Sequence, residues 1–425
     1  MIGTGVFTSL GFQVMGISSG FALLLLWFLG GIVGLCGAFA YSDLSRRYPR
    51  SGGEYNFLSQ IYHPAIGFLA GWISITVGFA APVAAAAIAF GRYFTSALDL
   101  TPLFPEIFGH LNIPVLLAIL LVVFLTLLHG TNKNAGAIFQ NIMTVTKVSF
   151  IIVLFVLGLT YGKNTGMSFL PSKKAGYDII SPAFAISMFF VSFAFSGWNA
   201  AAYILSEIKN PEKNVNRSLV IGTGFVILLY LILNFIFLYA VPIPELSGKI
   251  EVGFIFTQRI LGPNYGSVFG LIISILLISS VSSMIIVGPR VYNVVGEDYP
   301  ILRWLSRKNN DIPYVAIFLQ SLISIIFIIT STFEQVIIFV GFTLNLFTFL
   351  TVLGVFIYRF RLAPKERPKN NFGYPWLPGF FLLVNTWLLT YGIIYKPYES
   401  LAGMLITLTG LIVYFISRKG HVQHE

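Results

Sequence analysis

The sequence has one cysteine, Cys36, so no disulfide can form within the chain. Charged residues are also scarce, at 10% of 425 residues, whereas hydrophobic residues make up 56% and the mean hydropathy is +0.84. A soluble domain does not have an interior large enough to bury so much apolar side chain. The composition therefore excludes a soluble domain and predicts a membrane protein with several spans.

Signatures of several other protein classes are missing as well. No Gly-rich loop ends in Gly-Lys-Ser or Gly-Lys-Thr, the sequence that holds nucleotide phosphates, which argues against an ATP-driven pump. The histidines fall in loops, at span ends or in the tail without metal-ligand spacing, so we expect no metal and no cofactor. No nucleophile or acid-base set is evident, which argues against an enzyme.

Apolar stretches of about 20 residues are long enough to cross a hydrocarbon core of about 30 Å. Twelve of them lie near residues 1–20, 21–41, 65–93, 114–131, 137–161, 181–205, 216–241, 266–287, 313–330, 334–358, 377–395 and 399–417. Most Lys and Arg residues fall in loops that are cytoplasmic if the N-terminus lies on that side, which predicts cytoplasmic N- and C-termini. This topology explains the net charge of +10 without a nucleic-acid partner.

Two of these spans are interrupted at matching places. Residues 193–199 read Phe-Ala-Phe-Ser-Gly-Trp-Asn and break the sixth span, and residues 2–7 read Ile-Gly-Thr-Gly-Val-Phe and break the first. Inside a membrane, an opened helix is tolerated only where its backbone faces protein, a cavity or a ligand. Paired interruptions of this kind indicate the substrate site of a secondary transporter. Close helix packing is the alternative explanation for Gly3 and Gly5.

Five motifs then occur along the chain in a fixed order. They are Ile-Gly-Thr-Gly-Val-Phe at 2–7, Ser-Gly-Gly-Glu-Tyr at 51–55, Gly-Phe-Leu-Ala-Gly-Trp at 67–72, Phe-Ala-Phe-Ser-Gly-Trp-Asn at 193–199, and Glu207 with Asn210-Pro211. Together they resemble the amino acid-polyamine-organocation transporter family over nearly the whole chain. The Ser-Gly-Trp-Asn run is most similar to the L-type amino acid transporters and their bacterial relatives.

The resemblance implies an all-α membrane protein with twelve transmembrane helices, of which helices 1 and 6 are discontinuous. It implies an inverted five-plus-five repeat, with residues 1–162 and 163–360 as the two repeats and 361–425 as the last two spans and a cytoplasmic tail. The inner half of helix 1, expected before Gly3, is absent from this chain. We ascribe this to a start assigned at an internal methionine, with a shortened paralogue as the alternative.

The two interruptions offer complementary backbone groups to a ligand. Opening the sixth span exposes the carbonyl oxygens of Phe193, Ala194 and Ser196, which can accept hydrogen bonds from an ammonium. The NH groups of residues 3–5 lie at the start of a half-helix, where the helix dipole favours a carboxylate. These groups match the two ends of an α-amino acid. The predicted substrate-binding residues are Ile2, Gly3, Thr4, Gly5, Phe193, Ala194, Ser196, Gly197, Trp198 and Asn199.

Aromatic residues at the second interruption have two interpretations. We expect Phe193 to act as a lid, and Trp198 and Asn199 to brace the turn or line the pocket. The alternative for Trp198 is an ordinary position in the core or against lipid.

Lys147 lies deep within the fifth predicted span, about 15 Å from its start. An ionisable residue at that depth is a functional candidate. The resemblance implies that its ammonium takes the place of the Na⁺ bound by sodium-coupled relatives, next to the first and eighth spans. The eighth span carries hydroxyls at Ser279, Ser280, Ser282 and Ser283, of which we assign Ser279, Ser282 and Ser283 to the coupling site. Bridging of backbone carbonyls by the lysine, and backbone capping by the serines, are the alternatives.

Two acidic residues at span ends are candidates for a gate on the inner side. Asp43 ends the second span and Glu207 follows the sixth. Each is expected to pair with a basic residue, and a solvated charge at a helix end explains each nearly as well.

These features predict secondary active transport of amino acids by alternating access, as a proton symporter or an exchanger. Neutral L-amino acids are favoured because no Asp or Glu lies in the central half of any predicted span, where a cationic side chain would need a counter-ion. The alternatives are a transport-inactive sensor or channel on the same scaffold, and a transporter of cationic amino acids or polyamines.

The expected location is the plasma membrane, as the inner membrane of a bacterium. The loop cysteine that joins L-type transporters to a heavy chain has no counterpart in this sequence. We therefore expect a transporter without a disulfide-linked heavy chain, whose partners are its substrate and the lipid bilayer, and the oligomeric state stays open.

Overall fold

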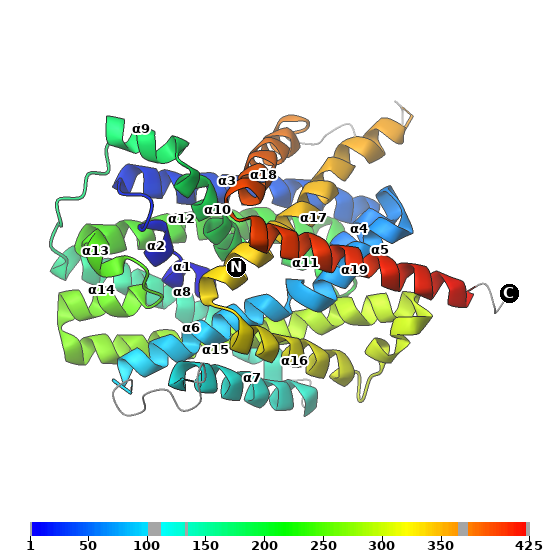
Figure 1. Cartoon of the computed structure of the whole chain (residues 1–425), viewed down its shortest axis with the longest axis horizontal. Coiled ribbons are helices and arrows are strands. Elements are labelled where there is room, and N and C mark those ends of the chain that lie inside the picture. The colour runs from blue at the N-terminus through cyan, green and yellow to red at the C-terminus, as the bar shows by residue number, and fades with distance from the viewer. Residues whose placement is uncertain (1, 101–111, 132–134, 364–372, 422–425) are drawn as a thin grey trace.

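A computed structural model describes residues 2–100, 112–131, 135–363 and 373–421. Helices account for nearly all of this part of the chain, in which the β-structure amounts to one isolated bridge between Asn309 and Ile312. The prediction of an all-α protein is confirmed. The helices run side by side as a bundle, with short helices at its two ends (Figure 1).

Nine helical segments of the described chain are long and apolar enough to cross a membrane. They are α3 (Gly20–Arg47), α5 to α6 (Pro64–Ile73 and Ala80–Ala97, joined by a π-helical turn at Ser74–Gly78), α7 (Ile113–Thr131), α8 (Ala135–Tyr161), α12 (Pro211–Ala240), α15 (Pro263–Asp298), α17 (Phe333–Arg361), α18 (Trp376–Tyr395) and α19 (Pro397–His421). The pair α9 (Lys173–Ile180) and α10 (Pro182–Phe195), bent by 70°, adds a tenth span if it is counted as one.

The remaining two predicted spans correspond to shorter helices. The apolar helix α16 (Tyr314–Thr330) has 17 residues, and the first predicted span is divided into α1 (Thr4–Thr8) and α2 (Leu10–Gln13). Helices outside the predicted spans were not predicted: they include α4 (Glu54–Ile61) and α9, and also α13 (Ile243–Leu246) and α14 (Val252–Leu261), which fill the connection from α12 to α15. A ten-residue helix such as α14 is too short to give the long apolar run by which spans are recognised.

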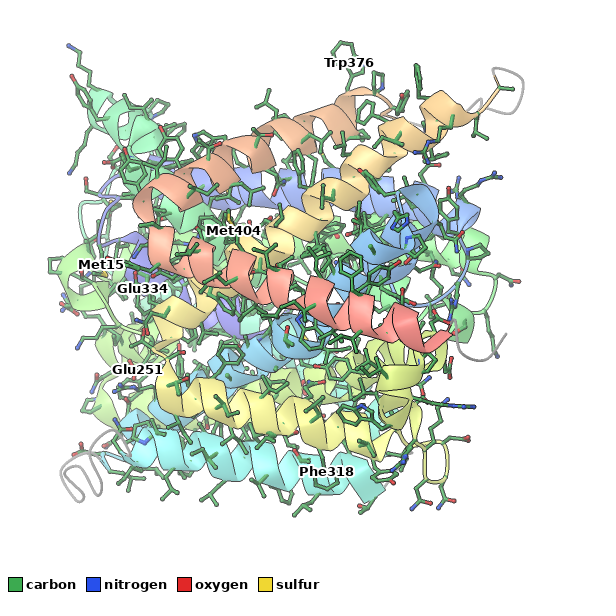
Figure 2. The ribbon with its side chains drawn as sticks, turned by 45° about the vertical axis from the view of Figure 1, so that its right-hand side comes forward. Met15, Glu251, Phe318, Glu334, Trp376 and Met404 are labelled. Carbon is green, nitrogen blue, oxygen red and sulfur yellow. The ribbon has the colours of Figure 1, made fainter. Side chains whose placement is uncertain are left out.

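The outer surface of the bundle is apolar. On α7, the exposed side chains Leu116, Leu120, Phe124 and Leu127 follow one another at helical spacing. Figure 2 shows Trp376 and Phe318 pointing outward on opposite sides of the bundle, and both are exposed. Exposing so continuous an apolar surface to water is unfavourable, whereas lipid chains solvate it.

The two ends of the bundle differ in charge and in structure. At one end lie α4 (Glu54–Ile61), the basic residues that close α3, and the C-terminal end of α19, and we call this the basic end (Figure 1). The helices α9, α13 and α14 lie at the opposite end (Figure 1). The orientation of these ends across a membrane stays a prediction.

Small residues allow the inner helices to approach closely. Helix α6 buries the alanines of residues 84–87 and packs along α15, while α3 packs along α12. If the second repeat begins at residue 163, these contacts join the second helices and the third helices of the two repeats. The division into repeats stays a prediction, and this pairing agrees with it.

Candidate functional site

The helix of the sixth predicted span opens where the sequence predicts it. Helix α10 ends at Phe195, and Ser196 turns the chain with a ψ of 140°. Gly197 has a φ of +95°, a left-handed conformation that glycine adopts without strain. Regular helix resumes only at α11 (Ala200–Tyr203).

The first interruption lies directly against the second. Gly3 is not helical, and α1 begins at Thr4, so the first NH groups of this helix have no partner within it. A Cβ atom at Gly5 would lie 2.5 Å from the Cα atom of Ala194 in α10. Only glycine permits this contact, which brings the start of α1 onto the last turn of α10.

Tyr230 of α12 bridges the two interruptions and was not predicted. Its hydroxyl donates a hydrogen bond of 3.0 Å to the Ala194 carbonyl oxygen and also bonds to the backbone of Gly3. A tyrosine within an apolar span resembles an ordinary core residue, so its sequence context does not indicate that its hydroxyl lies at the openings.

Backbone contacts correct the expectation of three exposed carbonyls. The Phe193 carbonyl accepts the NH of Ser196 at 3.0 Å, and the Ala194 carbonyl accepts the Tyr230 hydroxyl. No residue in the described part of the chain donates to the Ser196 carbonyl. A carbonyl oxygen has two lone pairs, so Phe193 and Ala194 keep one further acceptor site each.

A cavity of about 240 Å³ lies at the two interruptions. Its lining includes all ten predicted substrate-binding residues, namely Ile2, Gly3, Thr4, Gly5, Phe193, Ala194, Ser196, Gly197, Trp198 and Asn199. It also includes Lys147, Glu54 and Tyr203. Concave sites with a mostly apolar lining and a few polar groups are typical of small-molecule binding.

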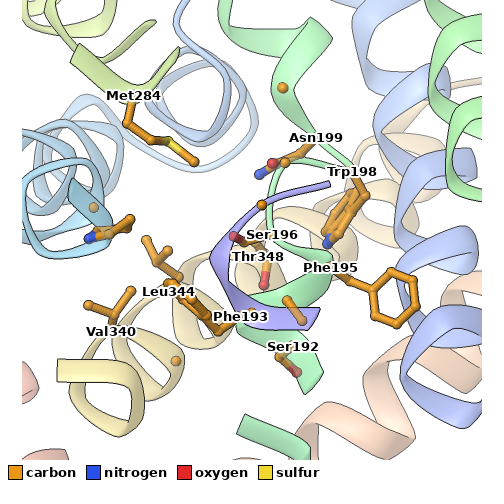
Figure 3. A pocket seen from close by; sticks show the side chains of 18 of the residues that line it. Ser192, Phe193, Phe195, Ser196, Trp198, Asn199, Met284, Val340, Leu344 and Thr348 are labelled. Carbon is orange, nitrogen blue, oxygen red and sulfur yellow. The ribbon is translucent and has the colours of Figure 1, made fainter. Parts of the chain in front are cut away.

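The aromatic residues of the turn lie on different sides of it. Figure 3 shows Phe193 beside Leu344 and Val340 of α17, all three residues line the cavity, and the role of Phe193 as a lid stays a prediction. Trp198 points the other way, into a groove of α3 where a Cβ atom at Gly37 would come within 2.6 Å of its ring. Its ring also packs edge-on against Tyr41, with centroids 4.8 Å apart. Trp198 therefore braces the turn against α3.

Lys147 lies at the edge of the cavity with only 5% of its surface exposed. Its Nζ atom donates to the Ile2 carbonyl oxygen and to the Ser280 hydroxyl, both at 3.1 Å. Among the described residues, no carboxylate lies within ion-pair distance of this ammonium. The lysine thus joins α8 to the start of the first interruption and to α15, using neutral partners.

The serines assigned to coupling contact another residue instead of Lys147. Ser279 and Ser283 donate to the Gln140 side-chain oxygen at 3.3 and 2.8 Å. Ser282 accepts a hydrogen bond from Gln140 at 3.2 Å and lies 2.8 Å from the buried ring of His129. Successive residues of an α-helix differ by about 100° in direction, so Ser280 faces Lys147 while its neighbour Ser279 faces Gln140.

Of the two gate candidates, Asp43 forms an ion pair, whereas the side chain of Glu207 is not described. Asp43 accepts hydrogen bonds from Arg359, at 2.9 Å, and from the Tyr358 hydroxyl, at 2.5 Å, and the Arg359 guanidinium stacks 4.1 Å from the Tyr374 ring centroid. This largely buried ion pair is not part of the cavity lining. Glu207 ends a 3₁₀ turn (Leu205–Glu207), and its side chain lies outside the described part of the structure.

A buried carboxylate that was not predicted reaches the cavity from a loop helix. Glu54 is the first residue of α4 and is 6% exposed. Its Oε1 atom accepts hydrogen bonds from the Tyr41 hydroxyl at 2.6 Å and from the Asn199 amide at 2.7 Å. The absence of acidic residues from the centres of the spans therefore does not leave the cavity without a carboxylate.

The sequence is similar to known proteins over almost its whole length. Residues 1–416 match the family model described as amino acid permease. The chain belongs to the amino acid permease family. It is 26% identical to the mouse (Mus musculus) b(0,+)-type amino acid transporter 1, over 98% of this chain and 84% of that protein. It is also 26% identical to the mouse large neutral amino acids transporter small subunit 2, and 23% identical to the human (Homo sapiens) cystine/glutamate transporter. These two matches cover 98% of this chain and 78% and 82% of the respective proteins.

The contact between α1 and α10 gives the first testable prediction for this permease. We expect Gly5→Ala to destabilise the purified protein by about 1–3 kcal/mol, because the added methyl group overlaps Ala194. The measurement is thermal unfolding in detergent. Gly224→Ala in α12, where a Cβ atom meets nothing within 4 Å, is the control. Equal unfolding temperatures for the two variants would contradict the contact.

The buried ion pair gives the second prediction. Asp43→Asn leaves the Arg359 charge buried without its counter-ion, and we expect a loss of about 3–5 kcal/mol in stability. The double variant Asp43→Leu with Arg359→Met removes both charges and should unfold at a higher temperature than the single variant. A double variant that is no more stable than Asp43→Asn would show that the pairing contributes little.

Proposed function

We propose that the protein is a secondary transporter of amino acids and not an enzyme. The observation that carries this proposal is the contact of two opened helices around one cavity. The NH groups at the start of α1 can donate hydrogen bonds to a carboxylate. The carbonyl oxygens of Ser196, Phe193 and Ala194 can accept hydrogen bonds from an ammonium. An α-amino acid carries both groups a fixed, short distance apart.

Relatives that match almost the whole chain support the same class of substrate. Their names describe a b(0,+)-type amino acid transporter, a transporter of large neutral amino acids and a cystine/glutamate transporter. Alternating access fits an opened-helix site, because each half can move against a rigid neighbour while the cavity stays between them.

The proposed substrate is a neutral amino acid. Among the described residues that line the cavity, Glu54 is the one carboxylate, and its Oε1 atom is already held by Tyr41 and Asn199. A cationic side chain would have to displace these donors to reach it. The alternative, a cationic amino acid or a polyamine, depends on such a displacement.

Two ways of driving transport fit the position of Lys147. Its ammonium links the start of the first interruption to α15 through hydrogen bonds to the Ile2 carbonyl and the Ser280 hydroxyl. Release of its proton would couple transport to a proton gradient, and a permanently charged lysine would suit exchange. Uptake that requires preloaded amino acid would identify exchange, and uptake that follows a pH gradient would identify symport.

The basic end is proposed to face the cytoplasm, in accord with the positive-inside rule. The protein would then be a multi-pass protein of the plasma membrane, the inner membrane in a bacterium. One relative is named a small subunit, but the sole cysteine of the present chain is buried in α3. We therefore propose that it works without a disulfide-linked heavy chain.

The third prediction tests transport and substrate class together. Proteoliposomes containing the purified protein should take up radiolabelled leucine or alanine in a saturable manner. Excess unlabelled neutral amino acid should compete, because it fits the same cavity, and arginine and putrescine should compete only weakly. Stronger competition by arginine or putrescine would refute the neutral substrate. Binding without any uptake would instead support the transport-inactive sensor.

The fourth prediction concerns Lys147. Lys147→Ala removes the link from α8 to Ile2 and Ser280, so we expect uptake to be abolished while the protein still inserts into the membrane. Lys396→Ala, which removes an ion pair with Glu334 away from the cavity, is the matched control and should transport normally. An active Lys147→Ala variant would remove this lysine from the mechanism.

A further inference from the structure

The segment Ser51–Tyr55 carries the motif Ser-Gly-Gly-Glu-Tyr, to which the proposed function assigns no task. It connects α3 to α4 at the basic end of the molecule. Three of its residues contact the chain that follows the α10 interruption. The Ser51 hydroxyl lies 2.7 Å from that of Ser206, the Gly53 NH donates to the Ala202 carbonyl at 3.2 Å, and Glu54 accepts from Asn199 at 2.7 Å.

Residue 53 must be a glycine for this segment to lie so close to Tyr203. Gly53 has a φ of +56°, and a Cβ atom there would lie 2.4 Å from the ring of Tyr203. Any other residue at this position would strain the backbone and push the ring away. The motif therefore has the shape needed to contact residues 199–206.

Glu54 is held in this contact as a buried carboxylate with neutral donors. Two of its donors come from different elements, Tyr41 on α3 and Asn199 at the turn. Within the described part of the chain, no basic side chain is close enough to form an ion pair with it. Removing a carboxylate from water is unfavourable unless its hydrogen bonds are replaced, so the Glu54 carboxylate favours the arrangement in which both donors are present.

The other side of the motif is anchored to α15. The Tyr55 hydroxyl donates to Asp298 Oδ2 at 2.5 Å, and the Arg50 guanidinium pairs with Asp298 Oδ1 at 2.7 Å. Burial, followed by the adjacent Asp298 carboxylate, raises the pKa of the Tyr55 hydroxyl, which therefore stays a donor. The motif thus joins residues 199–206 to the end of the helix that carries Ser280.

We propose that Glu54 is a positioning residue that keeps the basic end of the cavity closed. Glu54, Asn199 and Tyr203 all line the cavity, so the contacts that hold residues 199–206 in place lie directly beside the substrate position. Opening toward the basic end requires the hydrogen bond between Glu54 and Asn199 to break. The closing role of Glu54 rests on the proposed transport function, because only a transporter has to open and close its cavity. The hydrogen bonds that hold Glu54 in place do not depend on that function.

Access to the cavity can be measured with a reporter cysteine, because the chain has a single native cysteine. In a Cys36→Ser background, Thr348→Cys places a thiol in the cavity lining. A membrane-impermeant maleimide is applied to inside-out and to right-side-out vesicles, without substrate, and the rate of labelling is compared. Glu54→Ala should speed labelling from the basic end at least about tenfold, because it removes the hydrogen bond from Asn199 to a charged group, which has to break on opening.

Two milder variants and one control complete the experiment. Tyr41→Phe removes one donor to Glu54, and Ser51→Ala removes the contact with Ser206, so each should give a smaller shift in the same direction. Glu334→Ala removes a carboxylate near the opposite end, paired with Lys396, and should leave labelling unchanged. Monodisperse elution of each variant confirms that it is folded.

Each outcome decides one of the two proposals. Labelling rates from the basic end that are the same in the parent, Tyr41→Phe, Ser51→Ala and Glu54→Ala would overturn the role of Glu54, whether or not the parent transports amino acids. Faster labelling in these variants combined with a parent that takes up no amino acid would support the role of Glu54 and overturn the proposed transport function.

Discussion

The contact between Gly5 and Ala194 is the constraint on which the rest of the site depends. It places the start of α1 against the last turn of α10, so that two opened helix ends share one space. The Tyr230 hydroxyl bonds to both ends, which gives the pair a common anchor on α12. Lipid offers no hydrogen bonds to opened backbone, so a structure of this kind is stable in a membrane only when protein groups or a ligand complete it.

Two buried charges at the cavity are stabilised by neutral partners. Lys147 donates to a carbonyl and a hydroxyl, and Glu54 accepts from a tyrosine and an amide. Neutral partners can be exchanged at lower cost than an opposite charge, because separating an ion pair leaves both charges unsatisfied. Both residues are therefore suited to contacts that form and break as the protein changes conformation, and both bond to chain next to an opened helix.

How much of this could be predicted from the sequence depends on the kind of signal each residue leaves. A Ser-Gly pair or a lysine inside an apolar run stands out, and the positions of both interruptions, and of Lys147 next to the first and eighth spans, were anticipated. Glu54 was missed because it belongs to a short loop helix that tertiary packing brings to the cavity, and Tyr230 was missed because an aromatic in a span resembles core. The choice of Ser280 over its neighbours depends on the rotation of α15, which composition does not reveal.

The most direct test of the central claim is a cryo-electron microscopy structure of the protein in lipid nanodiscs with saturating leucine. We predict density for the amino acid between residues 3–5 and Ser196, with its carboxylate toward the start of α1 and its ammonium toward the end of α10. Density at a different place, or a continuous helix through residues 193–200, would contradict the account.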